Sequence, residues 1–125
     1  MMKFIFLNRL AFGFALIILV GACNNSISAQ TQSDYDKLCV IYKETLKKDI
    51  SPDMQAYEIA TRAEKEVPDI FTDFEHISSA NAEDAYPLLK KSAERATQKP
   101  WECPVIKDYY DSAYQKKLER EKKLK

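Results

Sequence analysis

No glycine occurs after Gly21, so residues 22–125 must fold without the residue that reaches positive φ angles at no steric cost. Phosphate-binding loops, dinucleotide-binding loops, nucleophile elbows and the tightest hairpin turns all depend on glycine. Their signatures are therefore absent from this segment. Because it is also rich in Ala, Glu, Lys and Leu, we predict an all-α fold, a small bundle of four to five short helices.

Prolines mark several of the expected helix starts, because proline is favourable at the first position of a helix and disruptive inside one. Ser51-Pro52-Asp53 combines a capping hydroxyl, a proline and a carboxylate, and it predicts that a helix begins there. Pro68, followed by an aspartate, and Pro104 predict two further starts. Apolar residues at 3–4 spacing predict an earlier helix over about 34–48.

A fourth segment, from about 82 to 98, also has helical spacing but contains Pro87. Asn81 and Asp84 resemble the capping pair of a helix that begins at 82. In that case Pro87 would kink the helix after its first turn. The alternative is a helix that begins near Tyr86, and the sequence leaves both open.

The first residues have the pattern of an export signal. Lys3 and Arg9 lie near the amino terminus, and the run from Leu10 to Val20 contains no charge. This run is shorter than the roughly 20 apolar residues that a spanning helix needs. We therefore predict a signal peptide over residues 1–22, with an uncleaved membrane anchor as the alternative.

The four residues Val20-Gly21-Ala22-Cys23 resemble the lipobox of bacterial lipoproteins. That resemblance implies cleavage before Cys23, a diacylglyceryl group on its thiol and a fatty acyl chain such as palmitate on the new amino terminus. The residue after the cysteine is Asn24 rather than Asp, which by the same resemblance favours the outer membrane facing the periplasm. A rival cut after Ala29 would instead release a soluble periplasmic or secreted protein that begins at Gln30.

The chain has three cysteines, an odd number that would leave one thiol unpaired in an oxidising compartment. Either cut resolves this, because Cys23 is lipidated or is lost with the signal. Cys39 and Cys103 remain, and we predict a disulfide between them.

Candidate sites for chemistry are few. Asp69, Asp73 and His76 share one side of an expected helix, but no second set of ligands accompanies them, so we predict no metal site. No serine or cysteine motif points to His76 as a base. We therefore expect neither an enzyme nor a bound cofactor.

Charge is unevenly distributed along the chain. Between Asp49 and Asp84 there are ten acidic residues and two basic ones, whereas residues 116–125 contain six basic and two acidic residues. An acidic exported domain is a poor match for nucleic acid. The acidic segment fits a partner with a basic surface. The predicted contact residues for a partner are Asp69 and Asp73, with two tyrosines on another surface, Tyr110 and Tyr114.

The sequence thus predicts a signal peptide at 1–22, a flexible tether at 23–33, a helical domain at 34–115 and a basic tail at 116–125. We interpret the tail as a frayed, solvated helix end, with contact to anionic lipid or a cell-wall polymer as the alternative. The predicted partners are the lipid bilayer, through acylated Cys23, and an unidentified envelope protein. The expected function is that of a membrane-anchored binding or scaffolding module. The alternative is a periplasmic inhibitor or immunity protein against an envelope-targeting toxin or hydrolase.

Overall fold

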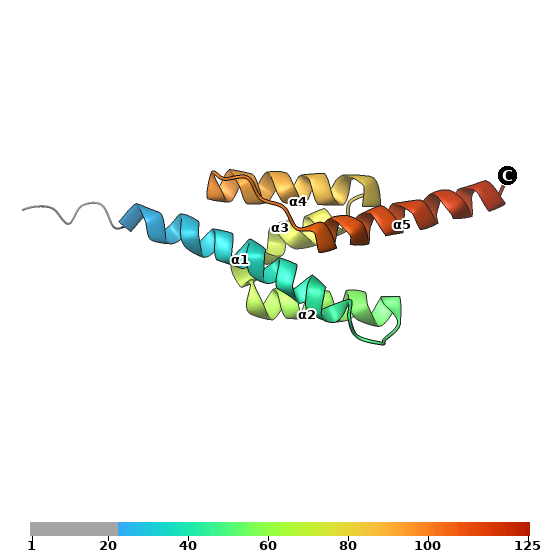
Figure 1. Cartoon of the computed structure of the whole chain (residues 1–125), viewed down its shortest axis with the longest axis horizontal. Helices are drawn as coiled ribbons and strands as arrows, with labels where there is room; N and C mark the ends of the chain where they lie inside the picture. Colours follow the sequence, from blue (N-terminus) through green and yellow to red (C-terminus); the bar gives the residue numbers. More distant parts are fainter. Residues whose placement is uncertain (1–22) are drawn as a thin grey trace, which may run out of the picture.

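Five helices and no strand make up the part of the chain that the computed structural model describes, residues 23–125, with side chains described from residue 34 onward (Figure 1). The helices are α1 (Cys23–Thr45), α2 (Pro52–Glu66), α3 (Pro68–Ser78), α4 (Ala82–Thr97) and α5 (Pro104–Lys123). The predicted all-α bundle is confirmed. The signal peptide expected at residues 1–22 lies outside the described residues.

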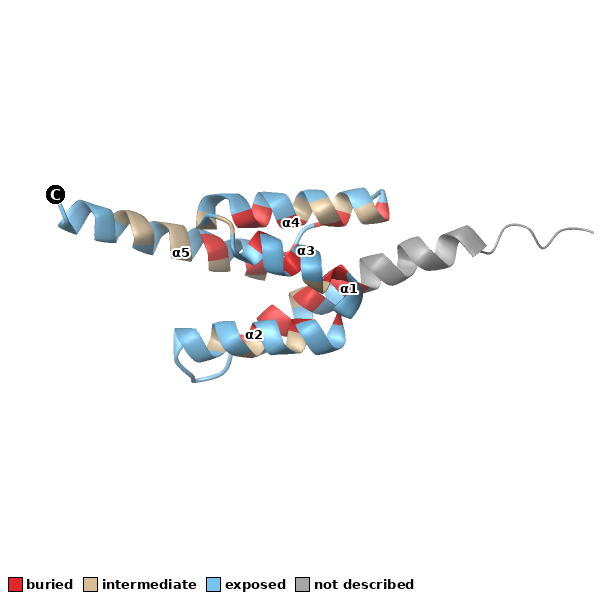
Figure 2. Cartoon of the chain, turned by 180° about the vertical axis from the view of Figure 1, so that it is seen from behind, coloured by how far each residue is buried: buried red, intermediate tan, exposed pale blue. Residues whose placement is uncertain are grey.

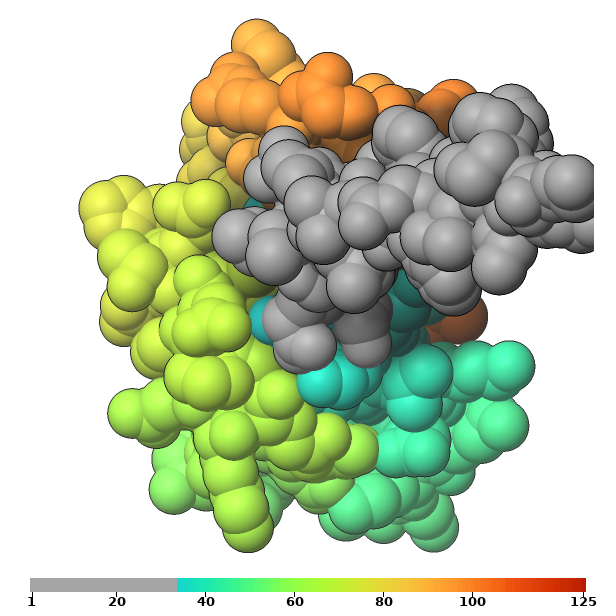
Figure 3. Space-filling model, turned by 90° about the vertical axis from the view of Figure 1, so that its left-hand side faces the viewer, coloured from blue at the N-terminus to red at the C-terminus, as the bar shows by residue number. Residues whose placement is uncertain are grey.

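The helix α1 is the centre of the bundle, because it contacts each of the other four helices. The buried residues, red in Figure 2, lie where the helices face one another. In the end-on view of Figure 3, α4 lies above the visible atoms of α1, and α2 and α3 lie to their left. The largest fully buried side chains of α1 include Leu38, Ile41 and Tyr42.

Local sequence chemistry explains where three helices begin. Pro52, Pro68 and Pro104 each occupy the first turn of a helix, as predicted. Ser51 caps α2, since its hydroxyl oxygen accepts a hydrogen bond of 3.3 Å from the backbone N–H of Met54.

Other helix boundaries differ from the predictions. The helix α1 begins at Cys23 rather than near residue 34, so the segment expected to be a flexible tether has a helical backbone. At the other end of the chain, α5 continues to Lys123, so most of the predicted basic tail belongs to this helix.

Pro87 lies inside α4, which begins at Ala82. The alternative of a start near Tyr86 is therefore wrong. Asn81 is the N-cap residue of α4, and its carbonyl accepts hydrogen bonds from the backbone N–H groups of Asp84 and Ala85, at 2.9 and 3.1 Å. No side-chain hydrogen bond caps this end, so Asn81 acts through its backbone rather than as half of a capping pair.

One residue of the described chain, Gln98, occupies the left-handed region that usually favours glycine, with φ of 57°. It ends α4, and its backbone N–H donates to the carbonyl of Glu94 at 2.8 Å. A non-glycine residue in this conformation costs about 1–2 kcal/mol. The glycine-free segment therefore contains a turn of the kind that glycine normally makes.

The predicted disulfide between Cys39 and Cys103 is present, with a Cα–Cα distance of 5.9 Å and a sequence separation of 64. It joins α1 to the residue that directly precedes α5. The side chain of Cys103 is fully buried, and its backbone N–H donates to the Tyr86 hydroxyl at 3.1 Å. The bond thus fixes the start of the last helix to the central one.

Candidate functional site

The four residues predicted to contact a partner differ in how far they are exposed. Tyr110 is only 7% exposed, and its hydroxyl shares a hydrogen bond of 3.2 Å with the hydroxyl of Tyr42 on α1. The prediction that Tyr110 presents an exposed surface is therefore wrong, because its side chain belongs to the core. Tyr114, one helical turn further along α5, is half-buried.

Asp69 and Asp73 are exposed on α3, together with His76. Within the described residues, no group of three or more His, Cys, Asp or Glu side chains is arranged to hold a metal ion. A role for Asp69 and Asp73 in partner binding stays a prediction.

The buried tyrosine pair, Tyr42 and Tyr110, makes the stability of the fold depend on pH in the alkaline range. Burial raises the pKa of Tyr42 well above 10.0, with a further contribution from Tyr110, and burial also raises the pKa of Tyr110. The folded state therefore retains phenolic protons that the unfolded chain releases. The stability from this pair is fully present below about pH 10 and is lost as the pH rises further.

We expect the urea midpoint of the wild type to fall between pH 10 and 11, and we expect Tyr42→Phe to reduce this fall. At pH 7 the variant should lose about 0.5–1.5 kcal/mol of unfolding free energy, because its hydrogen bond to Tyr110 is gone. Urea titrations followed by circular dichroism at several pH values would measure both effects. Tyr57→Phe is the control, since Tyr57 is 67% exposed, and it should behave as the wild type. An unchanged alkaline fall in Tyr42→Phe would contradict the assignment.

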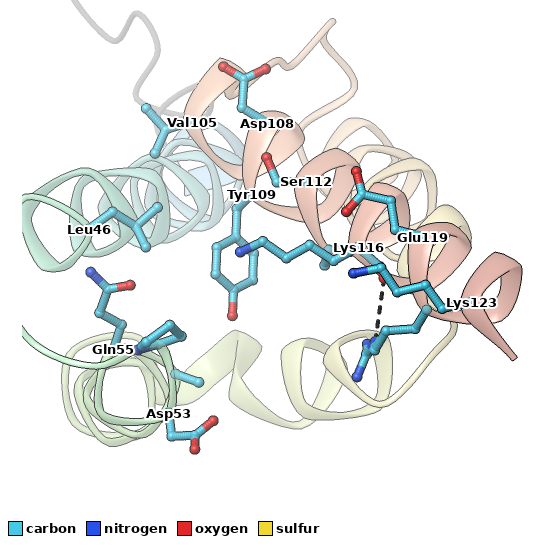
Figure 4. Close-up of a pocket in the computed structure, with 14 residues that line it drawn as sticks. Leu46, Asp53, Gln55, Val105, Asp108, Tyr109, Ser112, Lys116, Glu119 and Lys123 are labelled. Atoms are coloured by element: carbon cyan, nitrogen blue, oxygen red, sulfur yellow. Dashed lines mark hydrogen bonds between the residues drawn. The ribbon is translucent and has the colours of Figure 1, made fainter.

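A different surface has the shape of a binding site. A groove of about 970 Å³ lies between the first turns of α2 and one side of α5, from Val105 to Lys123, and Leu46, the residue after α1, also lines it (Figure 4). Pro52, Asp53, Gln55 and Ala56 form its α2 wall. We call this feature the α2–α5 groove.

The α5 wall of the groove changes character along the helix. Six of its nine lining residues recur every three or four positions and form one stripe, Val105, Tyr109, Ala113, Lys116, Arg120 and Lys123. The other three are Asp108, Ser112 and Glu119. The first three side chains of the stripe are apolar or aromatic, and its last three are cationic. The groove therefore has an apolar end near the start of α5 and a basic end toward its carboxyl terminus, and the Lys116 side chain reaches back from the basic end toward the Tyr109 ring (Figure 4).

The three cations of this stripe have no ion pair within the part of the chain that the structure describes. Arg120 donates only to the backbone carbonyl of Lys116, at 3.4 Å (Figure 4). By contrast, Lys107 and Lys117 on other faces of α5 pair with Asp111 and Glu83, at 2.7 and 3.4 Å. The three cations thus lack ion pairs among the described residues, although three carboxylates, those of Asp53, Asp108 and Glu119, also line the groove.

Sequence reasoning missed this groove. The spacing along residues 105–123 predicts one helical stripe, but the sequence alone favours a solvated helix end for its cationic half. The facing wall comes from α2, and nothing in the local sequence places α2 opposite α5.

Among the described residues, no helix has both the length and the apolar character needed to cross a bilayer. Compared with models of protein families, with curated proteins and with solved structures, the chain matches none of them.

Proposed function

We propose that the protein is a lipid-anchored binding module of the bacterial cell envelope, and that its contact surface is the α2–α5 groove. The observation that carries the proposal is the pairing of the cysteines. Cys39 and Cys103 form a disulfide, a bond that persists in oxidising compartments outside the cytoplasm. Cys23 is the one cysteine left over, and it stands at the end of the sequence that resembles a lipobox.

The arrangement of the helices supports a role at a distance from the membrane. Cys23 is the first residue of α1, a helix of 23 residues that is about 35 Å long. The carboxyl end of α5 lies at the opposite end of the molecule (Figure 1). A bilayer holding acylated Cys23 would leave the basic end of the groove on the far side, accessible to a partner in the periplasm.

A second candidate function is inhibition of a toxin or hydrolase, and the acidic segment of the chain favours it. Asp69 and Asp73 are exposed on α3, in a stretch with only two basic residues, Arg62 and Lys65. Arg62 is engaged by Glu44 and Glu66, at 2.9 and 2.7 Å, which leaves little free positive charge there. Such a surface would complement a basic active-site cleft.

Intact-mass analysis of the native product tests the anchor. We expect the wild type to begin at Cys23 and to carry the mass of a diacylglyceryl group and an additional acyl chain, and to partition with membranes. Cys23→Ala should lose the acyl mass and the membrane fraction. Asn25→Ala is the matched control and should keep both. A wild-type product that begins at Gln30 without acyl groups would refute the proposal.

A further inference from the structure

We infer that the α2–α5 groove binds an acidic amphipathic helix of a partner protein. The apolar face of that helix would pack on Val105, Tyr109 and Ala113, and its carboxylates would pair with the three cations of α5. This inference rests on the proposed role as a binding module and adds the chemical class of the partner.

The apolar end of the groove has a rigid floor. The Tyr109 ring packs edge-on against the rings of Tyr42 and Tyr110, with centroid distances of 5.3 and 5.2 Å. Burial raises the pKa of Tyr109, so its hydroxyl remains neutral. A preformed aromatic surface of this kind lowers the entropic cost of binding an apolar side chain.

The basic end of the groove determines the charge of the partner. Lys116, Arg120 and Lys123 form a cationic row without acidic partners in the described chain. Two acidic residues of α5 border the groove, but Asp108 and Glu119 point away from α2 in Figure 4. Asp53 lies on the α2 wall, and no ion pair joins it to the three cations within the described residues. An occupant with carboxylates over the outer half of α5 therefore meets complementary charge.

The length of the stripe favours a helix over a small molecule. From Val105 to Lys123, α5 rises about 27 Å, which is the length of roughly 18 helical residues. Helix-in-groove recognition uses such a row of contacts at 3–4 spacing. An anionic polysaccharide would satisfy the cations but would leave Val105, Tyr109 and Ala113 without apolar contacts. A protein helix supplies both kinds of group.

The test uses the purified full-length chain in detergent and two synthetic helical peptides of 18 residues, identical in a leucine stripe but flanked by glutamates in one and by lysines in the other. In fluorescence anisotropy we expect the glutamate peptide to bind at least about tenfold more tightly than the lysine peptide. The triple variant Lys116→Glu, Arg120→Glu, Lys123→Glu should reverse this preference. Ala56→Trp, which narrows the groove from an exposed position on α2, should weaken binding of both peptides.

The matched control is Lys43→Glu, Arg95→Glu, Lys99→Glu, which makes the same change in net charge at exposed sites outside the groove and should bind as the wild type. Equal binding of both peptides, or an equal loss in the two triple variants, would overturn the inference. So would self-association in sedimentation that the groove variant abolishes, or binding to phosphatidylglycerol vesicles in place of the peptide. None of these outcomes changes the intact mass at Cys23, so failure here is distinct from failure of the anchor.

Discussion

Replacing both Cys39 and Cys103 by alanine is expected to lower the free energy of unfolding by about 4 kcal/mol and the melting temperature by about 15–30 °C. The disulfide closes a loop with a sequence separation of 64, so its loss gives the unfolded chain a large gain in conformational entropy. The protein is small, and 4 kcal/mol is a large part of the stability of such a domain. Thermal unfolding followed by circular dichroism would measure the change.

Reduction of the wild type provides the control for this variant. Dithiothreitol should lower the melting temperature of the wild type toward that of the double-alanine variant and should leave the variant unchanged. Because Cys103 is fully buried, alanine there also leaves a small cavity, which makes the variant slightly less stable than the reduced wild type. A variant that melts within a few degrees of the oxidised wild type would contradict the role assigned to the bond.

Features set by local chemistry were predictable from the sequence. Pro52, Pro68 and Pro104 begin helices because the missing N–H of proline is not needed in the first turn. The Cys39–Cys103 pair followed from the odd number of cysteines and from the fate expected for Cys23. The helix starts and the cysteine pair can both be inferred without knowing how the helices pack.

Features set by packing were not predictable in the same way. Tyr110 and Tyr114 lie on the same side of α5, and the sequence favoured exposure of both. Tyr110 is buried because α1 places Tyr42 opposite it, at a sequence separation of 68. The groove escaped prediction for the same reason, since its two walls come from helices that are distant in the sequence.

Pro87 lies inside α4, and the helix tolerates it because the hydrogen bond that it removes is near an exposed helix end. A proline at this position removes the hydrogen bond that its N–H would give to the carbonyl of Glu83, in the first turn of α4. Glu83 and Pro87 are both exposed, so water can satisfy this carbonyl. The packing of Ala85, Tyr86 and Leu89 in the core then holds the helix together across the proline.

Trp101→Ala is expected to lower the free energy of unfolding by about 3–5 kcal/mol, the usual cost of removing a buried large aromatic side chain. Trp101 is 5% exposed and lies between the rings of Tyr35 and Tyr86, at centroid distances of 5.9 and 6.4 Å. Its indole N–H donates to Asp36 at 3.2 Å. The residue therefore joins α1 to α4 in the connector that precedes α5, and urea denaturation followed by far-ultraviolet circular dichroism would measure its contribution.

Trp101→Phe separates packing from the hydrogen bond of the indole. Phenylalanine retains most of the aromatic contact with Tyr35 and Tyr86, and the Asp36 carboxylate that loses its donor is exposed to water. We therefore expect this variant to lose only about 1–2 kcal/mol. The backbone of residue 101 is anchored independently, since its N–H donates to Glu94 and its carbonyl accepts from Lys90, at 3.2 and 2.7 Å. Equal losses in the two variants would show that the bond to Asp36, rather than the buried ring, stabilises this junction.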